Sequence, residues 1–336
     1  MRTPDGIILS CSSLELSEQE RDFFKQTNPL GFVLFKRNYV NRNQLRKLIA
    51  DLKEITINKN LLIFVDQEGG KVQRFDGEGF TKFPAQKMFG DIYKNNKKKS
   101  LELAYKSSYL MGMELKSIGV DVTFSPVCDI FFPDGNEVIG SRSFSENPKA
   151  VLELSREFCR GFNDSDIYPV LKHFPGHGRS KFDTHFKKSI VENSLEEIKK
   201  SDLVPFKLVK NEKMVMLAHI IYQNIDNKVA TYSEVIIKNI LRDSLSFKGL
   251  ILSDDLSMKA LSGDIISKVK KTYNAGCDVI LYCHGKLNEM SKIYPFSRKI
   301  DDEIYNYFIS KKSQKYFNND IFSIRKELIE NKVIAK

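Results

Sequence analysis

Residues 168–178 read YPVLKHFPGHG, an apolar run that passes directly into ionisable side chains. The run Tyr168–Leu171 is typical of a buried strand, because it is almost continuously hydrophobic. Lys172, His173 and His177 follow it, and the glycines among them allow a loop to pass close to a ligand. Ionisable side chains at the end of a buried strand are typical of an active site. The stretch therefore predicts a strand of a parallel sheet and the place where the chemistry lies.

Short apolar runs of the same kind recur along the chain at the interval of a helix plus a strand. We expect strands at Gly6–Ser10, Gly31–Phe35, Leu61–Asp66, Val120–Ser125, Tyr168–His173, Val215–His219, Leu250–Asp254 and Asp278–Cys283. Helical patterns lie between them, at Ser17–Gln26, Arg42–Ile57, Leu101–Ser117, Pro148–Asn163, Leu195–Val209 and Ser233–Ser246. Ser17 and Ser194 are each followed three residues later by glutamate, which is the pattern of a capped helix start.

The number and spacing of these runs predict the fold class. Eight alternations of strand and helix in fewer than about 300 residues fit a (β/α)8 barrel better than an open sheet. We predict an α/β fold, a (β/α)8 TIM-type barrel, in which residues 1–290 form the catalytic barrel. Residues 291–336, with helical patterns at Lys311–Lys315 and Ile324–Lys332, are expected to be a closing helix and a helical C-terminal extension of the same single domain.

Polar residues occur at or just after the C-terminal ends of the third to seventh predicted strands. They are Asp66, Asp129, Lys172 with His173, His219 and Asp254. Catalytic residues of barrels come from these strand ends. An open, doubly wound sheet also binds ligands there, but the chain has no GxGxxG turn after its first strand. The positions therefore favour a barrel and make these residues candidates for the site.

The composition is that of a globular protein, with 41% hydrophobic and 29% charged residues. No apolar run reaches the ~18 residues that span a bilayer. Only a short apolar stretch precedes Cys11, and a secretory signal needs roughly 7–15 apolar residues. We therefore expect a cytoplasmic protein with no membrane partner. We also expect a monomer.

The net charge of +10 comes mostly from dispersed lysines, with one cluster at residues 94–99. No zinc finger or RNA-binding motif accompanies them, which favours a solvated surface over a nucleic-acid site, while steering of an anionic substrate stays open. The five cysteines are odd in number and lack a CxxC pair. They are expected to be free thiols, so we predict neither a disulfide framework nor a zinc site.

The predicted strand Leu250–Asp254 ends in two neighbouring aspartates, Asp254 and Asp255. Neighbours on a strand point to opposite faces, so only one of them faces the barrel mouth. The other is expected to hydrogen-bond into the adjacent loop or to cap the next helix. A lone carboxylate at the mouth is suited to attack an anomeric carbon.

The segment Asp183-Thr184-His185 places a carboxylate two residues before a histidine. A carboxylate that binds one ring nitrogen holds the tautomer and leaves the other nitrogen to donate a proton. An ordinary surface histidine is the alternative at this stage.

Several other polar residues are suited to bind hydroxyl groups. Asp66 precedes a Gly-Gly turn, and its carboxylate can accept from two sugar hydroxyls, although a salt-bridged turn is an equal alternative. Arg142 lies among small residues, where its donors can reach a hydroxyl or carboxylate. Lys172 and His173 add donors from the fifth strand. His219 is either a core histidine or a residue of secondary importance.

Together, these motifs resemble the bacterial β-N-acetylhexosaminidases of glycoside hydrolase family 3. The matching segments are Asp66 to Gly70, Val138 to Phe144, Lys172 to Gly178, Asp183 to His185, Met216 to His219 and Ser253 to Met258. They occur in the family's order, and the resemblance covers about residues 5–285. Departures are small: Thr184 stands where the family usually has serine, Lys71 replaces an arginine, and Arg179-Ser180 fills a variable place in the loop.

The resemblance implies a role for each matching residue. Asp254 would be the nucleophile and His185, with Asp183, the acid/base. Asp66, Arg142, Lys172 and His173 would hold the hydroxyls of N-acetylglucosamine, and no metal or cofactor would take part. The loop from Lys172 to His185 would be mobile and would bring the acid/base in with the substrate.

The implied reaction removes terminal N-acetylglucosamine, with retention and through a covalent glycosyl-aspartate, from muropeptide fragments in peptidoglycan recycling. The implied substrate is N-acetylglucosaminyl-1,6-anhydromuramic acid, with or without its peptide. The alternatives are another family-3 β-glycosidase such as a β-glucosidase, or a non-catalytic sugar-binding protein. A substrate-assisted hexosaminidase and a metal-dependent hydrolase are less consistent with the motifs.

Overall fold

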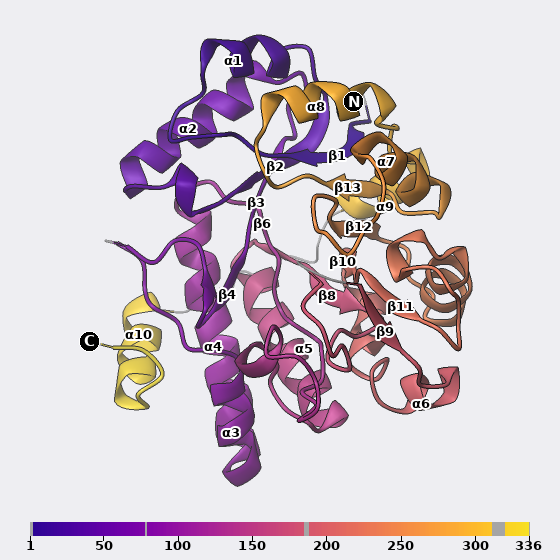
Figure 1. Ribbon diagram of the computed structural model, residues 1–336. Coiled ribbons are helices and arrows are strands. Elements are labelled where there is room, and N and C mark those ends of the chain that lie inside the picture. Colours follow the sequence, from indigo (N-terminus) through magenta and orange to yellow (C-terminus); the bar gives the residue numbers. More distant parts are fainter. Residues whose placement is uncertain (1–2, 78, 185–187, 311–319, 336) are drawn as a thin grey trace.

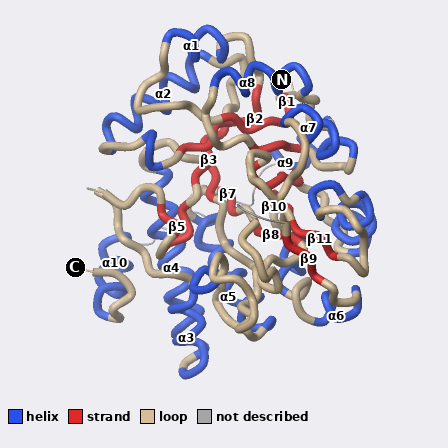
Figure 2. Tube along the Cα trace, viewed as in Figure 1, coloured by secondary structure: helices blue, strands red, loops and turns tan. Residues whose placement is uncertain are grey.

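The computed structural model of the chain describes residues 3–77, 79–184, 188–310 and 320–335. Its centre is a parallel sheet surrounded by helices (Figure 1, Figure 2). The strands are β1 (Asp5–Leu9), β2 (Pro29–Leu34), β3 (Leu62–Val65), β6 (Val122–Thr123), β7 (Tyr168–Pro169), β8 (Leu171–Phe174), β10 (Met214–Leu217), β12 (Leu250–Asp255) and β13 (Val279–Leu281). Each of the eight predicted strand regions is present, and the fifth is divided into β7 and β8.

The strand order shows that the sheet nearly closes on itself. It runs β7-β6-β3-β2-β1-β13-β12-β10-β8, so β7 and β8 lie at its two ends. Only Val170 separates these two strands in the chain. The amide of Cys128, beyond β6, also donates to the carbonyl of Lys172 in β8 at 2.7 Å. The two ends of the sheet are thus joined, and the predicted TIM-type barrel is confirmed.

Helices cover the outside of the barrel, as Figure 2 shows. They are α1 (Glu18–Phe24), α2 (Arg42–Ile55), α3 (Lys87–Asn95), α4 (Lys97–Lys116), α5 (Pro148–Asp164), α6 (Leu195–Lys200), α7 (Ile265–Asn274) and α8 (Leu287–Ile293). The capping boxes expected at Ser17 and Ser194 are both formed. The helix predicted for Leu195–Val209 is interrupted: α6 ends at Lys200, and a separate 3₁₀ helix follows at Pro205–Asn211, where proline suits the first helical position.

The apolar residues of the strands are buried on both faces. On β1, Ile8 belongs to the cluster that fills the barrel, whereas Ile7 and Leu9 pack with the surrounding helices. The same alternation separates Phe64 from its neighbours on β3. Burial on both sides explains why the sequence runs are almost continuously hydrophobic rather than alternating.

The C-terminal helices cover two different surfaces of the barrel. In α9 (Asp302–Ile309), Phe308 packs with Tyr168 at the start of β7, with ring centroids 5.0 Å apart, so α9 covers the N-terminal end of the barrel. In α10 (Ile321–Glu330), Glu327 pairs with Lys99 of α4 at 2.9 Å, and α10 lies beside α4 in Figure 1. The helix predicted at Ile324–Lys332 is therefore present. The pattern at Lys311–Lys315 lies outside the described residues.

Short pairs of strands that the sequence did not predict flank the barrel mouth. β4 (Gln67–Gly69) and β5 (Val72–Gln73) form an antiparallel hairpin directly after β3, and β9 (Ser189–Val191) pairs in parallel with β11 (Ile220–Tyr222). In the described ranges, none of the helices has the length and apolar character needed to cross a membrane.

Candidate active site

The C-terminal ends of the strands form a cavity of about 160 Å³ in which most of the predicted site residues meet. Its lining includes Asp66, Arg142, Lys172, His173 and Asp254. They come from the ends of β3, β8 and β12 and from the loop that follows β6. Parallel strands bring these ends to one edge of the barrel, which is why residues far apart in the sequence lie together.

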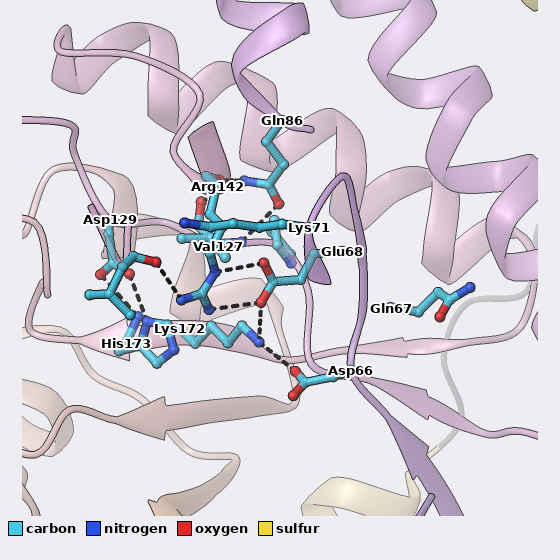
Figure 3. A network of polar contacts seen from close by, with 12 residues as sticks. Asp66, Gln67, Glu68, Lys71, Gln86, Val127, Asp129, Arg142, Lys172 and His173 are labelled. Carbon is cyan, nitrogen blue, oxygen red and sulfur yellow. Dashed lines mark hydrogen bonds and ion pairs between the residues drawn. The ribbon is translucent and has the colours of Figure 1, made fainter. Parts of the chain in front are cut away.

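Ion pairs join five residues at one side of this cavity, and Figure 3 labels four of them, Asp66, Glu68, Arg142 and Lys172. The ammonium of Lys172 lies 2.8 Å from Asp66 Oδ1 and 2.5 Å from Glu68 Oε1. Arg142 donates from Nε and Nη2 to the two oxygens of Glu68, each at 2.9 Å. Asp66 accepts a further bond of 2.9 Å from Arg74. The alternation of carboxylates and cations fixes the direction in which each donor points.

Both carboxylates of this network are held in the ionised form. Burial alone would raise the pKa of Asp66, but the charges of Lys172 and Arg74 outweigh it and keep the pKa well below its ordinary value. Burial would likewise raise the pKa of Glu68, and Arg142 and Lys172 lower it. Asp66 borders the cavity and can accept hydrogen bonds from a polyhydroxylated ligand, and Lys172, Arg142 and Arg74 border it as donors, whereas buried Glu68 orients two of them.

The hairpin after β3 explains how Glu68 reaches the network. Asp66 and Glu68 are two residues apart in an extended segment, so both can point to the same side. Gly69 and Gly70 then turn the chain with φ of +94° and +61°. A Cβ built on Gly69 would lie 2.3 Å from the carbonyl oxygen of Pro84, so only glycine fits this turn. The turn after Asp66 was predicted from the sequence, whereas the role of Glu68 was not, although its two-residue spacing from Asp66 could have indicated it.

A second polar chain starts from Asp129, which is buried behind the cavity. Asp129 Oδ2 lies 2.7 Å from His173 Nδ1, and Oδ1 accepts the backbone amides of His173 at 3.1 Å and His177 at 2.7 Å. Burial would raise the pKa of Asp129, but the two histidines lower it to about 2. The charged carboxylate therefore fixes the ring of His173, whose other nitrogen is directed away from Asp129.

His177 continues this chain to the loop that carries the predicted acid/base. Its Nε2 lies 3.0 Å from Thr184 Oγ1, and both residues are buried. Burial and the neighbouring His173 lower the pKa of His177 to about 4, so its imidazole is neutral at pH 7. This contact of His177 could not be predicted from the sequence motif, because a hydrogen-bond partner seven residues away is a property of the folded loop.

The two aspartates at the end of β12 have different surroundings. Asp254 lines the cavity, and its Oδ1 accepts the amide of Asp255 at 2.8 Å. Asp255 Oδ1 accepts the amides of Ser257 at 3.1 Å and Cys283 at 3.2 Å. Asp255 meets the expectation that one aspartate hydrogen-bonds into the adjacent loop, but it borders the cavity as well, so both aspartates lie at the mouth. The alternative that Asp255 caps a helix is wrong, because α7 begins only at Ile265 and its cap is Asp264.

His219 is a buried core histidine rather than part of the cavity wall. Its Nδ1 lies 2.7 Å from Thr231 Oγ1 and its Nε2 lies 3.1 Å from the carbonyl oxygen of Asp255. Burial lowers its pKa, so the ring is held neutral. Both nitrogens have partners, and these partners link β10 to the end of β12. This supports the structural alternative for His219.

Asp183 lines a wider space of about 600 Å³ that adjoins the cavity. Arg142, Asp255 and Met258 border both spaces, so the wider one is the outer part of the same mouth. Its lining also includes Lys71, Lys259 and His284. His185 lies outside the described residues, and the predicted pairing of Asp183 with His185 stays a prediction.

The loop between β8 and Asp183 is anchored at several points. Arg179 Nε donates to Asp202 at 2.8 Å, and Ser180 accepts the amide of Asn136 through its carbonyl at 2.7 Å. The carbonyl of Thr184 accepts the amide of Ala260, after β12, at 3.1 Å. These contacts describe one arrangement of the loop, and the expected motion stays a prediction. Across the described ranges, no three histidine, cysteine or carboxylate side chains come together as a metal site.

A parallel barrel whose C-terminal mouth combines carboxylates, cations and a histidine is the arrangement of an enzyme that acts on a polar substrate. Comparison with known proteins identifies the class. Residues 6–301 match the glycosyl hydrolase family 3 N-terminal domain, so the chain belongs to this family. It is a glycoside hydrolase of the β-N-acetylhexosaminidase type, as the motifs predicted.

Individual relatives support this assignment over most of the chain. A β-hexosaminidase of Stenotrophomonas maltophilia (strain K279a) is 39% identical over 285 residues, which are 84% of each chain. One from Xylella fastidiosa (strain 9a5c) is 38% identical over the same shares. The crystal structure of NagZ from Neisseria gonorrhoeae with N-trifluoroacetyl-D-glucosamine has a TM-score of 0.85 and 32% identity, covering 97% of this chain and 94% of that one.

Proposed function

We propose that this chain is a retaining exo-β-N-acetylglucosaminidase that removes terminal N-acetylglucosamine from muropeptide fragments in peptidoglycan recycling. In this proposal Asp254 is the nucleophile and His185, with Asp183, is the acid/base. Asp66, Arg142, Lys172 and His173 bind the hydroxyls of the sugar. The names of the relatives support the sugar, since they are called β-hexosaminidases and the neighbouring structure holds an N-acylated glucosamine.

The observation that carries the proposal is the position of Asp254. It is at the C-terminal end of β12 and borders the small cavity whose other wall is the network of Asp66, Lys172 and Arg142. A sugar ring held by that network has Asp254 beside it within the same cavity. The inner cavity is small and the space beyond it is wide, which fits one terminal sugar inside and the rest of the substrate outside.

The proposed reaction has two displacement steps. In the first, a carboxylate oxygen of Asp254 forms a bond to the anomeric carbon while the bond to the leaving oxygen breaks, and His185 gives its proton to that oxygen. In the second, His185 takes a proton from water, the water oxygen bonds to the anomeric carbon and Asp254 departs. Two inversions at the same carbon give N-acetylglucosamine with net retention of configuration.

The outer space supports an anionic aglycone. Lys71 and Lys259 line it, and His284 lies beside them with its Nε2 3.2 Å from Ser257 Oγ. Cations placed around the leaving part of the substrate attract a carboxylate such as that of 1,6-anhydromuramic acid or its peptide. A neutral glucoside has neither this carboxylate nor the acetamido group, so the proposal favours the N-acetylglucosaminyl substrate over a β-glucoside.

The test compares p-nitrophenyl β-N-acetylglucosaminide with the β-glucoside for the wild type and Asp254→Asn. A matched control is Asp243→Asn, which removes an exposed carboxylate in the same way. We expect the wild type and the control to cleave the acetamido sugar, Asp254→Asn to be inactive, and ¹H NMR to show the β-anomer as the first product. Cleavage that survives in Asp254→Asn, or an α-anomer as the first product, would refute the mechanism. Binding without cleavage would identify a sugar-binding protein.

A further inference from the structure

The side chain of Thr184 connects the loop after β8 to a buried histidine. Thr184 is 1% exposed and His177 is 3% exposed, so their 3.0 Å hydrogen bond is shielded from water. Thr184 directly follows Asp183 and directly precedes His185 in the chain. The contact therefore lies between the two residues of the proposed acid/base pair.

His177 is itself held from two directions. Its backbone amide donates to Asp129 Oδ1, the carboxylate that also binds the ring of His173. Its ring lies edge-on to the ring of His173, with centroids 5.5 Å apart. His177 is thus fixed to the same carboxylate as a residue proposed to bind the sugar. The position of His177 Nε2 is therefore fixed relative to His173, which lines the cavity.

The main chain of Thr184 has a second attachment, on the opposite side. Its carbonyl accepts the amide of Ala260 at 3.1 Å, and Ala260 follows Asp254 in the turn after β12. Thr184 consequently bridges the histidine that follows β8 and the turn that follows the proposed nucleophile. This main-chain bond does not depend on the side chain at position 184, so a substitution there tests the hydroxyl contact alone.

We propose that the hydrogen bond between His177 and Thr184 makes these two residues a positioning pair for the acid/base. The pair sets where Asp183 lies relative to Asp254, and both members line the same small cavity as Asp254. This inference rests on the proposed function, because it requires His185 to protonate the leaving oxygen. Catalysis depends steeply on such placement, and a displacement of about 1 Å can cost about 100-fold in rate.

The variants separate the hydroxyl from the volume of the side chain. Thr184→Val keeps the shape and removes the hydroxyl, whereas Thr184→Ser keeps the hydroxyl and removes a methyl group. The side-chain amide of His177→Gln reaches about as far as Nε2 of histidine, so this variant can keep the hydrogen bond to Thr184. The amide of His177→Asn reaches only as far as Nδ1, so this variant loses the bond. Circular-dichroism melting shows whether each variant is folded at the assay temperature.

The readout is the dependence of the rate on the leaving group. A substrate with a poor leaving group, phenyl β-N-acetylglucosaminide, needs the acid, and the 2,4-dinitrophenyl glycoside hardly does. For Thr184→Val and His177→Asn we expect kcat on the phenyl glycoside to fall about 10- to 100-fold. On the dinitrophenyl glycoside it should stay within about threefold, with KM unchanged on both. Thr184→Ser and His177→Gln should stay near the wild type.

A double variant tests whether the two residues act through each other. If they do, Thr184→Val combined with His177→Asn loses no more activity than either single variant. The inference is overturned if Thr184→Val behaves like Thr184→Ser, or if it slows both substrates equally. His185→Ala separates this failure from a failure of the proposed function. A leaving-group-dependent loss in His185→Ala alone refutes only the pair, and wild-type activity in His185→Ala refutes both.

Discussion

Replacing Glu68 by glutamine should damage both the stability of the barrel and its catalytic activity. The Glu68 side chain is 1% exposed and accepts two bonds of 2.9 Å from Arg142 and one of 2.5 Å from Lys172. Glutamine is almost the same shape, but its NH₂ group would face a donor of one of these cations. The change therefore leaves two buried cations with one carboxylate fewer and adds a donor–donor contact.

The magnitude follows from the burial of these groups. Removing one partner of a buried ion pair costs about 3–5 kcal/mol, because the remaining charge is left without compensation. The entropy of unfolding of a chain of 336 residues is about 0.7 kcal/mol/K, so the melting temperature should fall by about 4–7 °C. Activity should fall as well, because Glu68 orients both Arg142 and Lys172 at the cavity.

The assay is calorimetric melting at pH 7, together with kcat/KM on p-nitrophenyl β-N-acetylglucosaminide. Glu303→Gln is the matched control, since Glu303 is exposed in α9 and its change should cost less than about 0.5 kcal/mol. The expected loss is refuted if Glu68→Gln melts within about 1 °C of Glu303→Gln and keeps the wild-type kcat/KM. The ion pairs of Glu68 would then contribute neither to stability nor to the position of Arg142 and Lys172.

Three further predictions follow from individual side chains. Folding lowers the pKa of His177 from 6.5 to about 4, so between these pH values the unfolded chain binds more protons than the folded chain. The melting temperature should therefore fall as the pH is lowered from about 6.5 to 4. The fall should be less steep in His177→Gln, which has no imidazole at this position. Gly69→Ala should destabilise the chain by more than about 1 kcal/mol in urea unfolding, because φ is +94° there, and an unchanged midpoint would contradict this. Lys259 lines the outer space, so Lys259→Met should raise KM about two- to fivefold for N-acetylglucosaminyl-anhydromuramic acid, which carries a carboxylate. The KM for the p-nitrophenyl glycoside should stay unchanged. Equal effects on both substrates would rule out a role of Lys259 at the aglycone.

The sequence predicted the barrel because its strands are buried on both faces. Continuous apolar runs such as Leu250–Leu252 mark such strands, and their repeated spacing defines the fold. The positions of Asp66, Lys172 and Asp254 were predictable for the same reason, since they end these runs. Local patterns were less reliable for helices: the pattern predicted one helix over Leu195–Val209, whereas α6 ends at Lys200 and a 3₁₀ helix begins at Pro205.

The partners of the site residues could not be predicted from local patterns. Asp129 was recognised at a strand end, but its contact with His173 arises because β8 lies beside the segment after β6, and its contact with His177 comes from the loop after β8. His219 and His177 are both buried histidines, and one supports β12 whereas the other contacts Thr184. Which histidine lies near the site depends on contacts between segments far apart in the chain.

The proposed mechanism requires a covalent glycosyl-aspartate on Asp254, and trapping this intermediate tests the mechanism directly. The wild type is incubated with 5-fluoro-β-N-acetylglucosaminyl fluoride, in which ring fluorine slows the second step and fluoride leaves without help from an acid. Intact-mass measurement followed by digestion should place one sugar on the peptide that contains Asp254, and Asp254→Asn should remain unmodified. A sugar on a different residue would contradict the account, and so would turnover that proceeds without any adduct and gives an oxazoline formed by the substrate's own acetamide.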